Sequence, residues 1–261
     1  MKDIAVVIIS CDKYADLWKP FFTLFFRYWS DCPFPVYLVA NHLCYENPRV
    51  ITITVGDDHD WSSSMRKALE SIQSGFPIIL LEDYLLTAAV HTDTILEYAQ
   101  YMNDKRAACL QLFPRFSPIV GPVVQSDDHP DIGYIDRGAP YRVSLQAAIW
   151  DKQALDALLQ DGESPWEFET KGTVRSNSLE APFLSIMPEV KCPIPYFSSA
   201  VMGGKWHRDA IRLCNQENIP IDLEVRAQRT LLEDVRFLLL FHYAMRRRWI
   251  AQRVASLKHW G

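Results

Sequence analysis

Residues 4–12 read IAVVIISCD, which is six consecutive apolar side chains followed by polar ones. A continuous run that is rich in β-branched residues is typical of a strand buried on both faces, as in a parallel sheet covered by helices. The run is shorter than the roughly 20 residues of a transmembrane helix and the about 7–15 residues of a signal-peptide core. We therefore expect Ile4–Ile9 to be the first strand of an α/β sheet.

Strands and helices are expected to alternate downstream of this run. Short apolar runs predict strands at 35–40, 50–55, 77–81 and near 107–113. Apolar residues at helical spacing predict helices over 15–29, 62–74 and about 92–102. This repetition predicts an α/β fold with a mainly parallel, Rossmann-like sheet and helices on both of its faces.

The second half of the chain has weaker patterns. We expect loop with short strands over 114–140, a strand over 142–150, a helix over 151–160, and a mostly helical stretch with breaks over 164–187. Helices are also expected over 207–217 and 223–258. The predicted organisation is one domain, 1–222, followed by a basic helical extension, 223–261.

Composition excludes several classes of protein. The net charge is 27 − 32 = −5, so an overall basic nucleic-acid binder is not expected. No GxGxxG or GxxxxGK[ST] loop is present, which counts against dinucleotide dehydrogenases and P-loop NTPases. No Gly-x-Ser-x-Gly or zinc-type Cys/His spacing occurs either. The six cysteines have no disulfide-framework spacing and predict reduced thiols in a cytoplasmic protein.

Acidic clusters follow two of the predicted strands. They are Asp57-Asp58-His59-Asp60 and Glu82-Asp83-Tyr84. Ligands bind at the carboxyl ends of strands in open α/β sheets, and carboxylates there can hold Mg²⁺ or Mn²⁺ against a diphosphate. The alternatives are solvated acidic loops and, for Asp60, the N-cap of the helix that follows.

Several motifs, taken in order, resemble bacterial GT-A-type glycosyltransferases of surface-polysaccharide assembly, which make O-antigen, capsule or lipopolysaccharide. They are ISCDKY (9–14), DWSSSMRKAL (60–69), ILLEDY (79–84), SLQAAIW (144–150), ESPWEFE (163–169) and GGKW (203–206). The resemblance implies a GT-A-like fold and an inverting, hexosyltransferase-like enzyme. It also implies a donor half at about 1–113 and an acceptor half at about 114–222. The family's usual Asp-x-Asp is Glu82-Asp83-Tyr84 here, which leaves metal dependence open.

The resemblance also implies donor-site residues. The residues expected to bind the nucleotide sugar are Ser10, Asp12, Tyr14, Trp61, Ser64, Lys67, Glu82 and Asp83. Asp83 is the preferred metal ligand, with Glu82 second. Trp61 and Ser64 would lie at a helix N-terminus, where free backbone N–H groups favour phosphate. The alternatives are a turn capped by Asp12 and a solvated lysine at Lys67.

An inverting transfer needs a carboxylate to take the proton of the acceptor hydroxyl. Glu167 is the first candidate for this catalytic base and Glu169 the second. Ser164-Pro165-Trp166-Glu167 also has the spacing of a capping box, which is a purely structural alternative. Gln146 and Trp166 are the expected acceptor-binding residues, and core packing is the alternative for Trp166.

The C-terminal segment carries an excess of positive charge. Residues 236–261 contain six Lys or Arg and no Asp or Glu, which leaves −5 − 6 = −11 on the rest. Such a segment predicts peripheral contact with an anionic membrane, and packing on its own domain or on a second subunit is the alternative. For the whole chain, the alternative to an enzyme is a non-catalytic nucleotide-sugar-binding scaffold subunit. A nucleotidyltransferase is less favoured, because the Gly-rich first loop is missing.

Overall fold

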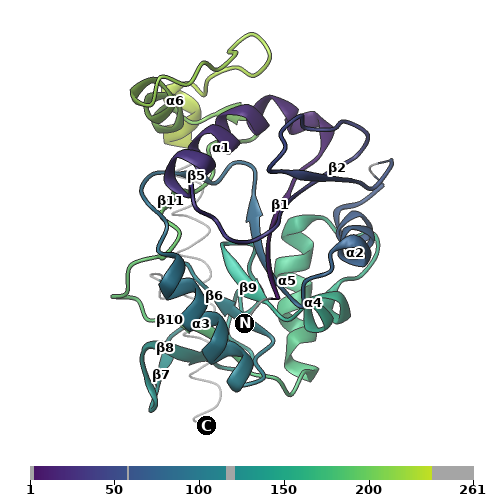
Figure 1. Ribbon diagram of the computed structural model, residues 1–261, viewed down its shortest axis with the longest axis vertical. Helices are drawn as coiled ribbons and strands as arrows, with labels where there is room; N and C mark the ends of the chain where they lie inside the picture. Colours follow the sequence, from purple (N-terminus) through teal and green to yellow (C-terminus); the bar gives the residue numbers. More distant parts are fainter. Residues whose placement is uncertain (1–2, 58, 116–120, 237–261) are drawn as a thin grey trace.

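The computed structural model describes residues 3–57, 59–115 and 121–236, and it shows a mixed α/β fold built on one large sheet (Figure 1). The sheet has nine strands in the order β3-β2-β1-β4-β9-β6-β10-β8-β7. Its strands are β1 (Ile4–Ile9), β2 (Val36–Ala40), β3 (Ile51–Thr54), β4 (Phe76–Leu81), β6 (Cys109–Gln111), β7 (Val123–Ser126), β8 (His129–Ile135), β9 (Ala148–Trp150) and β10 (Phe183–Ile186). The predicted first strand and the mainly parallel sheet are confirmed.

The helices follow the predicted order. They are α1 (Ala15–Tyr28), α2 (Trp61–Ser71), α3 (Thr92–Asp104), α4 (Lys152–Leu158), α5 (Pro165–Arg175) and α6 (Arg208–Gln216), with short 3₁₀ turns at Asp12–Tyr14 and Ser176–Ser178. Two small ribbons complete the fold, β5 (Leu85–Leu86) with β11 (Tyr196–Phe197), and β12 (Val201–Met202) with β13 (Lys205–Trp206).

Strand β1 lies between β2 and β4 and is parallel to both. Ile9 is in register with Val39 on one side and with Leu81 on the other, so these three strands end at the same edge. Strands β8 and β9 run against the others, because each pairs antiparallel with both of its neighbours.

Alternate side chains of β1 enter two separate cores. Ile4, Val6 and Ile8 pack with α1 and α3 on one face, while Ala5, Val7 and Ile9 pack with α2, α4 and α5 on the other. This arrangement explains why the strand is continuously apolar and confirms helices on both faces of the sheet.

The predicted strand over 142–150 is wrong for its first six residues, since only Ala148–Trp150 forms β9. Side chains, rather than a neighbouring strand, satisfy the backbone there. Val143 N–H donates to Thr173 Oγ1 at 3.1 Å, and Leu145 N–H donates to Glu169 Oε1 at 2.7 Å. Residues 142–147 therefore form a loop that lies along α5.

The expected helical stretch over 164–187 is wrong at its end. Residues Phe183–Ile186 form the fully buried strand β10, parallel to β6 and antiparallel to β8. Four consecutive mostly apolar residues carry no period that separates a buried strand from a buried helix.

The expected helix over 223–258 is wrong at its start. Residues 223–230 contain a turn and an extended stretch, in which Ala227 and Arg229 hydrogen-bond to the backbone of Trp206. A helix begins at Leu231 and continues through Arg236, and the rest of the predicted helix lies outside the described residues. Within the described part of the chain, no helix is long and apolar enough to cross a membrane.

Candidate functional site

The candidate site lies where β1 and β4 end. The chain places β2 and β3 on one side of β1 and places β4 on the other, so the strand order reverses between β1 and β4. In open α/β sheets, ligands bind at the carboxyl ends of the strands at such a switch point. The residues that follow β1 and β4 directly are Ser10 and Glu82.

Glu82 and Asp83 form a carboxylate pair at this switch point. Glu82 is only 8% exposed, and its side chain hydrogen-bonds that of Ser10. Burial and the neighbouring charge of Asp83 raise the pKa of Glu82 to about 8, while burial raises the pKa of Asp83 to about 6. Two carboxyl groups with raised pKa values at a strand end are characteristic of functional sites.

Asp12 holds the loop that follows β2. Its carboxylate accepts backbone N–H bonds from Asn41 at 3.0 Å, from His42 at 3.1 Å and from Leu43 at 3.3 Å. The Asn41 side chain returns the contact, because its Oδ1 accepts from the Asp12 N–H at 3.0 Å. Asp12 thus orders the carboxyl ends of β1 and β2, which agrees with the loop-capping alternative.

Tyr14 contacts an arginine that is far away in the sequence. The guanidinium of Arg226 lies 4.5 Å from the centre of the Tyr14 ring and makes a two-pronged ion pair with Asp16, at 2.8 Å to each oxygen. Arg226 also donates to the carbonyls of Lys13 at 2.9 Å and Gly204 at 3.1 Å. Sequence patterns missed Arg226, because 210 residues separate it from Asp16 and nothing local marks it.

The β12–β13 hairpin forms another side of the site. The backbone of Val201 hydrogen-bonds the Asp83 carboxylate, and the Ala200 N–H donates to the Asp83 carbonyl at 3.0 Å. Gly203 and Gly204 both have positive φ, +58° and +76°, as a two-residue hairpin turn of this kind requires. The GGKW motif of the sequence therefore lies next to the carboxylate pair.

The start of α2 follows the end of β3. Asp60 is its N-cap and accepts from the Ser63 N–H at 2.8 Å, which confirms the capping alternative. Trp61 packs on Phe168 of α5 with ring centres 5.1 Å apart, while Lys67 Nζ donates to the Val55 carbonyl at 3.2 Å. Ser64 lies in the first turn of α2, where its backbone N–H donates to the Asp60 carbonyl. Asp58 lies outside the described residues.

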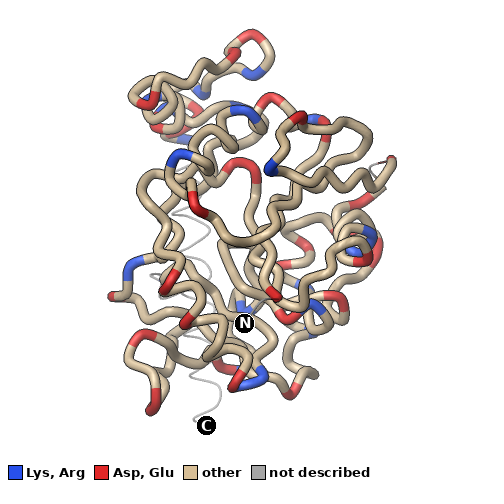
Figure 2. Tube along the Cα trace, in the orientation of Figure 1, with Lys and Arg blue, Asp and Glu red and all other residues tan. Residues whose placement is uncertain are grey.

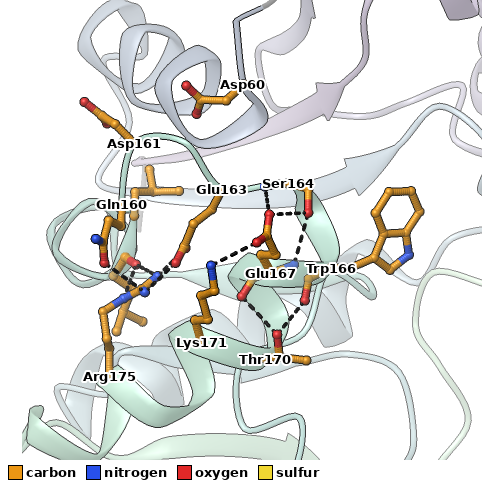
Figure 3. Close-up of polar contacts among 12 residues, drawn as sticks. Asp60, Gln160, Asp161, Glu163, Ser164, Trp166, Glu167, Thr170, Lys171 and Arg175 are labelled. Carbon is orange, nitrogen blue, oxygen red and sulfur yellow. Dashed lines mark hydrogen bonds and ion pairs between the residues drawn. The ribbon is translucent and has the colours of Figure 1, made fainter.

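Glu167 belongs to the capping box of α5 (Figure 3). Its Oε2 accepts from the Ser164 N–H at 3.0 Å and from the Ser164 hydroxyl at 2.9 Å, and its Oε1 pairs with Lys171 at 2.9 Å. The contacts with Ser164 and Lys171 lower the pKa of Glu167 to about 2. Both carboxylate oxygens are therefore engaged, and the group is a weak proton acceptor.

Glu169 lies on the buried side of the same helix. Its Oε1 accepts from the Leu145 N–H at 2.7 Å and from the Ser144 hydroxyl at 3.2 Å. Burial raises the pKa of Glu169, which makes it a better proton acceptor than Glu167 at neutral pH.

Tyr84 connects Glu169 to the carboxylate pair. Its hydroxyl donates to the Leu145 carbonyl at 3.2 Å, and Leu145 is the residue whose N–H binds Glu169. Burial, followed by the charges of Asp83, Glu169 and Glu82, raises the pKa of Tyr84 well above its ordinary value. The charges of all three carboxyl groups therefore act on one tyrosine.

Gln146 hydrogen-bonds to the hydroxyls of two tyrosines whose rings stack on each other. Its Nε2 donates to the Tyr84 hydroxyl at 3.1 Å, and its Oε1 accepts from the Tyr196 hydroxyl at 2.8 Å. The rings of Tyr84 and Tyr196 are 4.7 Å apart and nearly parallel. No local pattern marks Tyr196, because its partners lie far away in the sequence, in β5 and in the loop before β9.

Trp166 is 75% exposed, so the core-packing alternative is wrong. Figure 3 shows its ring directed away from the Ser164–Glu167 contacts. An indole that stands free beside the start of α5 leaves an apolar surface open to a ligand.

The carboxylate pair offers oxygen ligands of the kind that divalent cations prefer. Among the described residues, no group of three or more His, Cys, Asp or Glu side chains is arranged to hold a metal ion. Mg²⁺ commonly takes only one or two protein carboxylates, with phosphates and waters completing its shell. The chemistry of Asp83 and Glu82 therefore fits a divalent cation that arrives with a diphosphate.

Comparisons with known proteins gave likeness in fold only. No protein-family description and no curated protein matches the chain. Among solved structures, residues 1–349 of S. aureus TarS in complex with UDP match with 12% identity and a TM-score of 0.47, over 75% of this chain and 59% of that one. A UDP-glucose pyrophosphorylase complexed with UDP-glucose matches with 8% identity and a TM-score of 0.46, over 74% and 94%. The 4-diphosphocytidyl-2C-methyl-D-erythritol synthase of Anaerococcus prevotii matches with 10% identity and a TM-score of 0.45, over 83% and 96%. No activity is transferred from these likenesses.

Proposed function

We propose that the protein is a glycosyltransferase that moves a sugar from a nucleotide-sugar donor to a hydroxyl of a glycan or lipid-linked acceptor, in surface-polysaccharide or lipopolysaccharide assembly. The observation that carries the proposal is the Glu82–Asp83 carboxylate pair, buried beside Ser10 at the switch point between β1 and β4. That is the position at which an α/β sheet binds a nucleotide.

In this proposal the donor diphosphate lies at the carboxyl ends of β1 and β4. Asp83, with Glu82 second, would hold Mg²⁺ or Mn²⁺, and the cation would neutralise the charge that develops on the leaving diphosphate. Ser10, Asp12 and Tyr14 would line the nucleoside side. At the start of α2, near Trp61 and Ser64, Lys67 would supply positive charge toward phosphate, because the N–H groups of residues 62–64 already donate to Glu163 and Asp60.

We place the proton transfer on Glu169 in preference to Glu167. The Glu169 carboxylate would take the proton of the acceptor hydroxyl while that oxygen attacks the anomeric carbon. The bond from that carbon to the diphosphate oxygen breaks, and the nucleoside diphosphate leaves with the electron pair. Attack from the face opposite the leaving group inverts the anomeric carbon. Trp166 and Gln146 would contact the acceptor.

We further propose that the enzyme acts inside the cell, in peripheral contact with an anionic membrane. All six cysteines are free thiols, which suits a reducing compartment. A lipid-linked acceptor would be met at the membrane surface, and the excess of Lys and Arg over 236–261 would attract the protein there.

The proposal is tested with a thermal-shift panel of nucleoside diphosphates and nucleotide sugars, with and without Mn²⁺. A ligand of the native state at 100 times its Kd raises the unfolding free energy by about 2.7 kcal/mol. We expect one nucleotide sugar to stabilise the protein, and its released nucleoside diphosphate to appear when acceptor is added. Binding without release would identify the scaffold alternative, and no binding by any member would contradict both.

A further inference from the structure

The helix that begins at Leu231 has an unusual distribution of side chains. It starts with a capping box, in which the Thr230 hydroxyl accepts from the Glu233 N–H at 3.2 Å and Glu233 Oε2 accepts from the Thr230 N–H at 2.8 Å. Its first turns therefore have a defined start and a defined orientation on the body of the protein. Figure 1 shows this start beside α6.

The acidic side chains of this helix are directed toward the body. Glu233 pairs with Lys205 at 2.6 Å, and Asp234 pairs with the largely buried Arg229 at 2.7 Å. Arg208, at the start of α6, lies 3.7 Å from the Asp234 carboxylate. The negative charges of this helix are thus neutralised by cations of the described domain.

The apolar side chains of the same helix are directed outward. Leu231 is 63% exposed, Leu232 78% and Val235 50%, and Arg236 beside them is also exposed. A helix on the surface of a domain normally buries its apolar side chains and exposes its charges. This helix does the opposite, so its apolar face has no partner among the described residues.

Two more exposed apolar side chains lie upstream in the sequence. Leu223 is 42% exposed and Val225 67%, so residues 223–235 hold half of the large exposed apolar side chains in the described part of the chain. Elsewhere in the described trace, charged positions of both signs are interspersed (Figure 2). Exposed apolar side chains that share one face of a helix, as Leu231, Leu232 and Val235 do, mark an interaction surface.

The charge of the sequence indicates what covers this surface. From Arg236 to the end there are six Lys or Arg, no Asp or Glu, and two tryptophans, Trp249 and Trp260. Each Lys or Arg near an anionic bilayer strengthens attraction by about fivefold, and Trp favours the bilayer interface. An apolar face followed in the sequence by six Lys or Arg and two Trp is complementary to an anionic bilayer, because a bilayer offers negative charge and an apolar interior together.

We propose that the outer face of residues 231–236, formed by Leu231, Leu232, Val235 and Arg236, docks on an anionic phospholipid surface. The inward ion pairs of Glu233 and Asp234 keep negative charge away from the lipid and fix this face in a constant orientation. The inference rests on the membrane contact in the proposed function and specifies the face that makes it, but it does not need the transfer reaction to be correct.

The test is sedimentation of the full chain with vesicles, in the absence of nucleotide. The vesicles are phosphatidylcholine alone, or phosphatidylcholine with about one third phosphatidylserine. The variant Leu232→Glu/Val235→Glu changes the proposed face, and the matched control Val174→Glu/Val124→Glu adds the same charge at side chains that are 68% and 51% exposed elsewhere. All four sites are exposed, so both variants are expected to fold, and thermal unfolding checks this.

We expect the parent and the control to bind the anionic vesicles. The partition coefficient of the face variant should be at least tenfold lower than that of the parent. Binding to phosphatidylcholine alone should be much weaker, and added salt should reduce binding to the anionic vesicles. Equal partition of the face variant and the parent would overturn the proposal, as would absence of binding by the parent. A dimer of the parent that the face variant dissociates would instead identify a second copy as the occupant. Absence of vesicle binding with nucleotide binding retained would leave the proposed transfer reaction standing and would contradict only its membrane contact.

Discussion

Replacing Glu169 with glutamine separates the two carboxylates that the sequence offers as catalytic base. The amide of Glu169→Gln keeps an oxygen that can accept from the Leu145 N–H and the Ser144 hydroxyl, so the loop over 142–147 should stay in place. What the variant loses is the ability to take a proton. The matched variant is Glu167→Gln, on the same helix and with the same change of chemistry.

The structure sets the size of each effect. If Glu169 accepts the acceptor proton, Glu169→Gln should lower kcat by about 10²–10⁴-fold, the usual contribution of general base catalysis. Glu167→Gln keeps the capping-box geometry, so kcat should change by less than about tenfold and stability by less than the ~1 kcal/mol of a lost cap. Donor affinity should be unchanged in both, because neither side chain contacts the switch point directly.

The stability of the Glu169 variant provides a second check. Burial raises the pKa of Glu169 in the folded state, so the folded protein binds this proton more tightly than the unfolded chain does. The carboxylate therefore lowers stability as pH rises above its unfolded pKa of about 4.3. Glu169→Gln removes that penalty, and its melting temperature at pH 7–8 should equal or exceed the parent's. Turnover within tenfold of the parent in Glu169→Gln, together with an inactive Glu167→Gln, would refute the assignment.

Three further predictions follow from the charged groups of the structure. Asp83→Asn should weaken Mn²⁺-dependent binding of a nucleoside diphosphate at least tenfold by calorimetry, whereas Asp57→Asn, at an exposed position, should leave it within twofold. Because burial and neighbouring charge raise the pKa of Glu82 to about 8, metal-free stability should fall as pH rises from about 4 to 8, and Glu82→Gln should flatten that slope in thermal melts. A steeper slope in Glu82→Gln would contradict the raised pKa. Arg226→Met should cost about 3 kcal/mol in urea unfolding, because its ion pair is largely buried, while Arg212→Met, whose side chain is 70% exposed, should cost under about 1 kcal/mol. If both variants lost the same free energy of unfolding, burial of the Arg226–Asp16 pair would contribute nothing to stability.

Local spacing was sufficient where an interaction spans a few residues. The N-cap at Asp60 and the capping box of Ser164 and Glu167 could be predicted because donor and acceptor lie within three residues of each other. The first strand could be predicted because its continuous apolar run needs two covered faces. Acidic residues at strand ends could be placed at one edge of the sheet, because parallel strands end at the same edge. Glu82 and Asp83 do lie at that edge.

Local spacing failed where long-range contacts decide the conformation. Residues 142–147 have strand-forming composition, but the side chains of Thr173 and Glu169 take up their backbone N–H groups. Residues 183–186 are too short a run to carry a period, and their place between β6 and β8 makes them a strand.

The α/β class, the order of the first helices and strands, and the acidic groups after β3 and β4 could all be predicted from the sequence. These depend on side-chain periodicity and on contacts between near neighbours, which any reader of the chain can count. The sequence could not show that Glu167 closes a capping box while Glu169 is largely buried against the loop over 142–147, because the two side chains lie on different sides of α5. Folding also brings Arg226 onto Asp16 across 210 residues and turns the leucines at 231–232 outward. The pKa of a carboxyl group and the exposure of a leucine are properties of their surroundings, and those surroundings exist only once the chain has folded.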